Sequence, residues 1–119
     1  MIVTDEQIRT EITKAINENH VMLFMKGTPD EPRCGFSARM VGMLDSLGAD
    51  YAAMDILPHP FIRQELSELS GWPTIPQLFV DGKLVGGCDI VMELHDSGEL
   101  ATIVSPAQEG AATPASSTE

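Results

Sequence analysis

The chain has 119 residues, a length typical of a single domain. Hydrophobic residues make up 43% and charged residues 21%, as in globular proteins, which excludes wholesale disorder. Seven basic and 18 acidic residues give a net charge of −11, which argues against nucleic-acid and acidic-membrane partners because both require a basic surface. No apolar run reaches the roughly 18 residues of a membrane span.

The first predicted element is a helix that begins after Thr4. Thr4 and Gln7 have the spacing of a capping box, in which each side chain binds the backbone N–H of the other residue. The apolar face is marked by isoleucines four residues apart, at Ile8, Ile12 and Ile16. Residues 17–19 end this pattern, and the short apolar run 21–25 predicts a buried strand.

The segment 26–34 is rich in glycine, proline and charge and predicts a loop. A second helix is expected from Gly35 to the stop signal at Gly48. Its inner face is expected to carry Phe36, Met40, Met43, Leu44 and Leu47. A second strand is expected at 51–56, and a strand, a helix and a strand within about 35 residues form a βαβ unit, so the two strands should be parallel.

A third helix is expected from Pro60, which fits a first helical turn, to Gly71. Its inward residues are expected to be Ile62, Leu66 and Leu69. Strands at 77–80 and 83–86 flank Asp81-Gly82, a strong two-residue turn signal that predicts an antiparallel hairpin.

A fourth helix is expected to begin with Asp89 as its cap and to end at Gly98. Its inward residues are expected to be Ile90, Val91 and Leu94, and residues 100–104 to add one more turn. The order of elements predicts an α/β domain over residues 1–104, with a four-stranded mixed sheet covered by helices on both faces. Small and polar residues dominate 105–119, which predicts a disordered tail.

Cys34 is the first candidate for chemistry, because it stands where a strand is followed by the start of a helix. Free backbone N–H groups and the positive end of the helix dipole favour a thiolate there, and Arg33 adds a neighbouring cation. The alternative is that Cys34 is a small buried hydrophobic residue, as many free cysteines are. Its polar, loop-like neighbours favour the reactive thiol.

The residue three positions after Cys34 is Ser37, and a hydroxyl is not a competent nucleophile toward sulfur. Cys34 therefore acts alone, with another thiol molecule, or as a metal ligand. Two cysteines are too few for a disulfide framework, and the first residues lack the order of a signal peptide, so we expect a reducing, cytoplasmic location. The three histidines share no metal-ligand spacing, and surface or packing roles are expected for them.

Four motifs follow one another along the chain, and their combination is highly specific. They are Lys26-Gly27-Thr28-Pro29, Cys34-Gly35-Phe36-Ser37, Trp72-Pro73-Thr74-Ile75-Pro76-Gln77-Leu78 and Gly86-Gly87-Cys88-Asp89-Ile90. In this order they closely resemble the monothiol glutaredoxins of the CGFS class, over residues 5–104. The resemblance implies a thioredoxin-like (glutaredoxin) fold with a cis peptide bond before Pro76, beside which Trp72 is expected to bury its ring.

The resemblance implies that the protein binds glutathione, a tripeptide with two carboxylates, one ammonium group and one thiol. Lys26 and Arg63 would hold the glycine carboxylate, and the backbone of Ile75 would pair with the cysteinyl segment. Cys88 and Asp89 would take the γ-glutamyl end, since N–H groups at a helix N-terminus bind carboxylates and the Asp side chain meets the ammonium group. The other implied pocket residues are Phe36, Thr74, Pro76 and Gly87. Residues 64–68 are more acidic than in many members of the class, which lowers the positive potential expected near Arg63.

The resemblance also implies a [2Fe–2S] cluster with Cys34 as the metal ligand. Such a cluster typically takes four thiolates. The family arrangement is a homodimer that holds the cluster through two Cys34 thiolates and two glutathione thiols, and without the cluster we expect a monomer. Cys88 is expected either to form a reversible disulfide with Cys34 or to belong simply to the glutathione-binding turn.

Three functions follow from the resemblance. The first, which we favour, is an iron–sulfur cluster carrier or assembly factor that passes clusters to client apoproteins. The second is a glutathione-dependent thiol–disulfide oxidoreductase with Cys34 as the catalytic nucleophile, an activity that is generally weak in the CGFS class. The third is an iron-regulatory adaptor that forms a heterodimer with a BolA-like protein.

Overall fold

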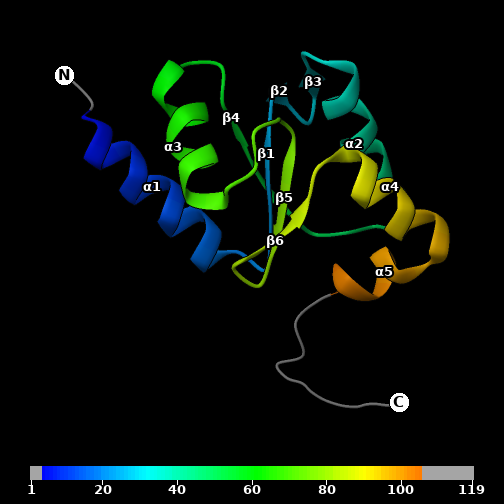
Figure 1. Cartoon of the computed structure of the whole chain (residues 1–119). Coiled ribbons are helices and arrows are strands. Elements are labelled where there is room, and N and C mark those ends of the chain that lie inside the picture. The colour runs from blue at the N-terminus through cyan, green and yellow to red at the C-terminus, as the bar shows by residue number, and fades with distance from the viewer. Residues whose placement is uncertain (1–3, 106–119) are drawn as a thin grey trace.

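The computed structural model describes residues 4–105. Its main sheet has the strand order β4-β1-β5-β6, formed by β4 (Ala52–Asp55), β1 (Val21–Met25), β5 (Gln77–Val80) and β6 (Lys83–Gly86). β1 is parallel to β4 and antiparallel to β5, and β6 is antiparallel to β5. One face is covered by α1 (Asp5–Glu18) and α3 (Pro60–Ser70), and the other by α2 (Gly35–Ser46), α4 (Cys88–Ser97) and α5 (Glu99–Ile103) (Figure 1). The predicted mixed sheet between two helical layers is confirmed.

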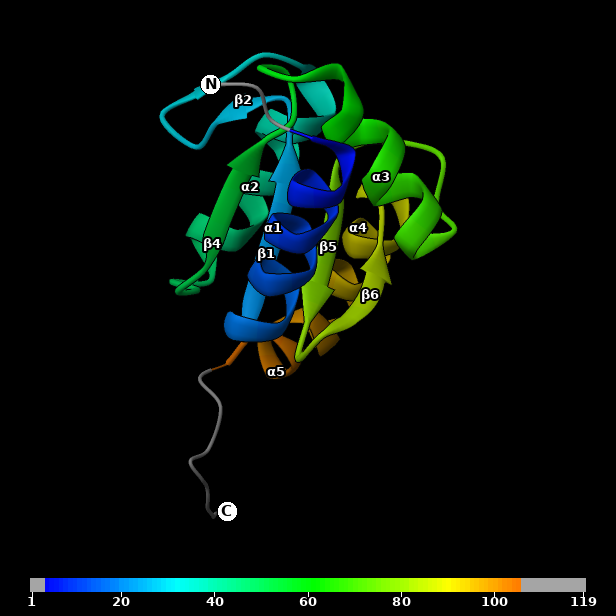
Figure 2. The same ribbon diagram turned by 90° about the vertical axis from the view of Figure 1, so that its left-hand side faces the viewer.

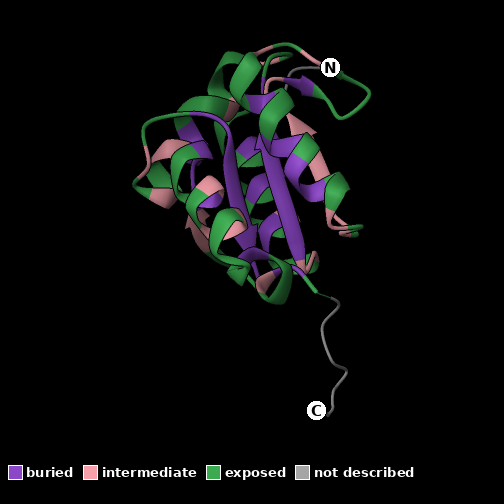
Figure 3. Ribbon diagram, turned by 90° about the vertical axis from the view of Figure 1, so that its right-hand side faces the viewer, coloured by how far each residue is buried: buried purple, intermediate pink, exposed green. Residues whose placement is uncertain are grey.

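The central strand β1 is buried on both faces, which explains its unbroken apolar sequence. Val21, Leu23 and Met25 pack into the core formed with α2, α4 and α5. Met22 and Phe24 pack into the core formed with α1 and α3. Figure 2 looks onto the layer of α1 and α3, and Figure 3 shows from the opposite side that burial is concentrated in the central strands.

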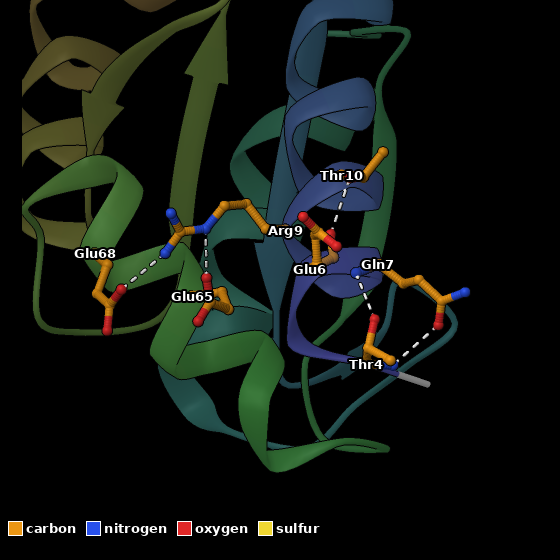
Figure 4. Close-up of polar contacts among 7 residues, drawn as sticks. All are labelled: Thr4, Glu6, Gln7, Arg9, Thr10, Glu65 and Glu68. Atoms are coloured by element: carbon orange, nitrogen blue, oxygen red, sulfur yellow. Dashed lines mark hydrogen bonds and ion pairs between the residues drawn. The ribbon is translucent and has the colours of Figure 1, made fainter. Parts of the chain in front are cut away.

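The predicted capping box fixes the start of α1. The backbone N–H of Gln7 donates to Thr4 Oγ1 (3.1 Å), and the backbone N–H of Thr4 donates to Gln7 Oε1 (2.9 Å) (Figure 4). The three isoleucines of the helix, Ile8, Ile12 and Ile16, are all buried, as their spacing predicts. The hairpin turn is also confirmed, because Asp81 and Gly82 have φ values of 53° and 82°, the two positive angles that a type I′ turn requires.

The structure differs from the predicted elements at three places. The predicted loop 26–34 contains a small antiparallel hairpin of β2 (Gly27–Thr28) and β3 (Glu31–Pro32). The strand expected at 51–56 is limited to 52–55, the residues that pair with β1. The cap of α4 is Gly87 rather than Asp89, which lies inside the first turn and places a carboxylate near the positive end of the helix.

Three residues that were expected to face the core are exposed instead. Phe36, Leu69 and Ile90 have exposed fractions of 57%, 43% and 36%. Phe36 and Ile90 lie in the first turns of α2 and α4, and Leu69 lies in the last turn of α3, where the helix extends past the residues that pack on the sheet. Helical periodicity identifies a face but does not show where along the helix the neighbouring layer ends.

Apart from Ser105, the predicted tail 105–119 lies outside the described residues. Within the described part of the chain, no helix has the length and apolar character needed to cross a bilayer.

We expect Thr4→Ala to destabilise the domain, because it leaves an N-terminal N–H group of α1 without its side-chain acceptor. The loss of an N-cap typically costs about 1 kcal/mol, which corresponds to a fall in Tm of roughly 4–8 °C for a domain of this size. Thermal unfolding followed by circular dichroism measures it. Thr13→Ala, at an exposed position of the same helix, is the control; equal Tm values for the two variants would contradict the capping role.

Candidate functional site

The β2–β3 hairpin returns the chain to the end of β1 and so places Cys34. The backbone N–H of Arg33 donates to the Lys26 carbonyl (2.8 Å), and the N–H of Gly27 donates to Asp55 Oδ1 (2.9 Å) at the end of the neighbouring strand β4. Gly27 has a φ of 90°, and a Cβ there would lie 2.7 Å from the backbone nitrogen of Arg33. Only glycine fits this close approach.

Cys34 is the N-cap residue of α2 and is partly exposed. Burial raises the pKa of its thiol, but hydrogen bonds from the backbone N–H groups of Ser37 and Phe36, a hydrogen bond from the Ser37 hydroxyl and the charge of Lys26 together outweigh burial and lower the pKa. The predicted lowering of the pKa of the Cys34 thiol is therefore confirmed. The predicted contribution of Arg33 is not observed, because its guanidinium binds Glu31 (3.2 Å) instead.

Ser37 has a role that the sequence reasoning missed. Its side chain is completely buried, and its hydroxyl oxygen accepts a hydrogen bond from the backbone N–H of Lys26 (3.1 Å). The hydroxyl can therefore donate its proton toward the Cys34 sulfur while it holds the end of β1. The sequence did contain an indication of this role. Ser37 stands three residues after the N-cap Cys34, and the backbone N–H at that position normally points at the capping side chain.

The predicted cis peptide bond between Ile75 and Pro76 is present. The loop before it is held by Gln77, which is completely buried and whose Nε2 donates to the carbonyls of Trp72 (2.9 Å) and Thr74 (3.1 Å). From the sequence, Gln77 was predicted as a strand residue and as part of the motif 72–78, with no role for its side chain. An amide side chain at the first position of an otherwise apolar strand could have indicated this role, because buried amides require hydrogen-bond partners.

Cys88 differs from Cys34 in its environment. It is buried in the first turn of α4, after the N-cap Gly87. Burial raises the pKa of its thiol, the charges of Asp89 and Cys34 raise it further, and Arg39 only partly opposes this. At neutral pH Cys34 is therefore the more nucleophilic of the two thiols.

These segments surround a hollow of about 410 Å³. Every residue predicted for the site from the sequence lines it, namely Lys26, Cys34, Phe36, Arg63, Thr74, Ile75, Pro76, Gly87, Cys88 and Asp89. Trp72 and Ile90, which were not predicted to line the site, complete it. The hollow therefore combines a thiol of lowered pKa with two cations, Lys26 and Arg63, and the carboxylate of Asp89.

Comparison with known proteins identifies the family. The family model described as Glutaredoxin matches residues 21–85. Glutaredoxin 4 of Escherichia coli (strain K12) is 51% identical over 94 residues, which is 79% of this chain and 82% of that protein. Monothiol glutaredoxin-S11 of Oryza sativa subsp. japonica is 49% identical over 104 residues, which is 87% of this chain but only 21% of that longer protein.

The fold matches a solved structure of the same family. The crystal structure of a buckwheat glutaredoxin–glutathione complex is similar with a TM-score of 0.74 and 29% sequence identity, and the match covers 84% of this chain and 89% of that chain. The thioredoxin-like arrangement expected from the motifs is therefore confirmed.

We expect Ser37→Ala to raise the pKa of Cys34, because it removes a hydrogen bond to the thiolate. A rise of one pKa unit would slow alkylation by iodoacetamide at neutral pH by up to about tenfold. The rate is measured against pH in a Cys88→Ser background, with Ser46→Ala, elsewhere on α2, as the control. A Ser37→Ala profile identical to that of the parent would contradict the assignment.

The sequence motifs and the comparisons lead to the same classification. The family model and the relatives cover most of the domain, and the Cys34-Gly35-Phe36-Ser37 motif stands at the start of α2 with serine in place of a second cysteine. The chain belongs to the glutaredoxin family, in its monothiol CGFS class.

Proposed function

We propose that this protein carries a [2Fe–2S] cluster as cargo, bound between two subunits through Cys34 and glutathione. The observation that carries the proposal is the single partly exposed thiol of lowered pKa, Cys34, in a hollow that also presents two cations. A thiolate is the ligand that iron–sulfur clusters take from proteins.

Glutathione fits the chemistry of the hollow. Its carboxylates match Lys26 and Arg63, and Asp89 at the start of α4 matches its ammonium group. Ile75 precedes the first paired residue of β5, so its backbone groups lie outside the strand ladder and can pair with an extended peptide. The buckwheat glutaredoxin, which has the same fold, was solved as a complex with glutathione, and this supports the same ligand here.

The number of ligands supports a dimer. Among residues 4–105 there is no group of three or more His, Cys, Asp or Glu side chains that could hold a metal ion. Burial and the raised pKa of Cys88 disfavour it as a ligand, which leaves Cys34 as the thiolate that one chain supplies. Two chains and two glutathione thiols make up the four ligands that the cluster takes. Acceptors would be client apoproteins in a reducing compartment such as the cytoplasm.

Reconstitution tests the proposal. The protein is incubated anaerobically with iron, sulfide and glutathione and then separated by size exclusion. We expect visible absorbance at the dimer position, its loss when glutathione is omitted, no cluster in Cys34→Ser and most of the cluster retained in Cys88→Ser. A full cluster on Cys34→Ser would refute the proposal.

The lowered pKa of Cys34 also favours a second candidate, thiol–disulfide exchange with glutathionylated proteins. The Cys34 thiolate would attack the glutathione sulfur of a mixed disulfide and release the protein thiolate. A glutathione thiolate would then attack the Cys34–glutathione disulfide, releasing glutathione disulfide and regenerating Cys34. A colourless monomer after reconstitution, together with rapid turnover of a glutathionylated substrate, would favour this function. A cluster that forms only with a BolA-like protein present would instead favour the adaptor function.

A further inference from the structure

Helix α3 carries the site cation Arg63 and two acidic residues close to it in sequence. Glu65 and Glu68 bind one residue of α1: Arg9 Nε lies 2.6 Å from Glu65 Oε1, and Arg9 Nη2 lies 2.9 Å from Glu68 Oε1. Figure 4 shows the guanidinium of Arg9 between these two carboxylates. Arg9 therefore supplies a countercharge to the acidic run that follows Arg63.

The two acidic residues differ in what they would do without Arg9. The side chain of Glu65 is only 7% exposed, so its carboxylate is fixed in the contact between α1 and α3. The side chain of Glu68 is 52% exposed and is free to turn about its rotatable bonds. Loss of Arg9 would therefore leave Glu65 buried without this partner. Glu68 could then form an ion pair with a different cation.

Arg63, whose Nη2 donates to the Pro73 carbonyl (3.3 Å), shares a hollow with Glu68. A second hollow, of about 560 Å³, lies beside α3 and is lined by Pro60, Arg63, Gln64, Ser67, Glu68 and Pro73. Among these lining residues Arg63 is the one cation and Glu68 the one anion. Arg63 also lines the hollow that contains Cys34, so this residue belongs to both hollows.

We propose that Arg9 is a positioning residue for Arg63: by binding Glu68 from α1, it prevents Glu68 from pairing with Arg63 and leaves that guanidinium available to an incoming carboxylate. This inference rests on the proposed function, in which Arg63 holds a carboxylate of glutathione. It also explains how the acidic run after Arg63 is compatible with an anion-binding site. Arg9 contributes without contacting the ligand.

The size of the effect follows from the strength of exposed ion pairs. Competition from one exposed carboxylate should weaken glutathione binding about three- to fivefold, the upper range for such a pair. The weakening should shrink as salt is added, because the Debye length falls from about 30 Å at 0.01 M to about 3 Å at 1 M.

The test is calorimetric titration of the reduced full chain with glutathione, at low and high salt, with Tm measured for each variant. Arg9→Met should weaken binding and lower Tm. Glu68→Gln in the Arg9→Met background should restore the affinity but not the Tm, because Glu65 is still buried without Arg9. A merely structural role predicts the opposite, an affinity that follows Tm and ignores Glu68.

Two further variants keep the test decisive. If Arg9→Met does not fold, Arg9→Met with Glu65→Gln removes the buried charge, and its affinity should still be low until Glu68→Gln is added. Lys14→Met, which removes an exposed cation of α1, is the matched control and should bind glutathione like the parent.

Arg63→Gln distinguishes the role of Arg9 from the proposed glutathione site. Weaker binding by Arg63→Gln with unchanged binding by Arg9→Met would overturn the role of Arg9 alone. Unchanged binding by Arg63→Gln, or no binding by the parent, would overturn the proposed glutathione site and with it the role of Arg9.

Discussion

The buried hydroxyl of Ser37 joins the end of β1 to the start of α2, and the chemistry of the site depends on this connection. It accepts the N–H of Lys26 and supports the Cys34 sulfur from the other side. Ser37 thereby connects the end of β1 to the residue whose thiol has the lowered pKa. The serine of the Cys-Gly-Phe-Ser motif is therefore a structural and electrostatic element, as well as a position that lacks a resolving thiol.

Charge is distributed unevenly in this molecule. The chain carries a net charge of −11, yet its described hollow around Cys34 contains two of its seven basic residues. A third, Arg9, binds the acidic residues that follow one of those two. The two carboxylates of α3 that follow Arg63, Glu65 and Glu68, are thus paired with a cation of α1.

Much of the fold could be predicted because its signals are local. The capping box, the isoleucine spacing and the Asp-Gly turn each act over a few residues, and the structure follows them. All the predicted site residues except Arg63 lie in the four motifs, and Arg63 was placed in the site by the family resemblance; their roles are still predictions. The exposure of Phe36 could not be predicted, since periodicity does not show where the opposing layer ends.

Contacts between distant residues were also outside the reach of sequence patterns. Arg9 and Glu65 are 56 residues apart, and nothing in either segment indicates the other. The role of Gln77 depends on carbonyls exposed by the cis-proline loop, a geometry that no spacing encodes. The β2–β3 hairpin has two residues in each strand, too few for any alternation to be read.

The strand order determines when each edge of β1 can find its partner during synthesis. β1 is central, but the strand that covers its second edge, β5, begins only at Gln77. At about 5–20 residues per second, translation of the intervening segment takes roughly 3 to 10 seconds. Until β4 is made both edges of this entirely apolar strand lack a partner, and from then until β5 is made one edge still does; such edges pair with other chains. The β5–β6 hairpin therefore ends the period in which the nascent chain is most prone to aggregate.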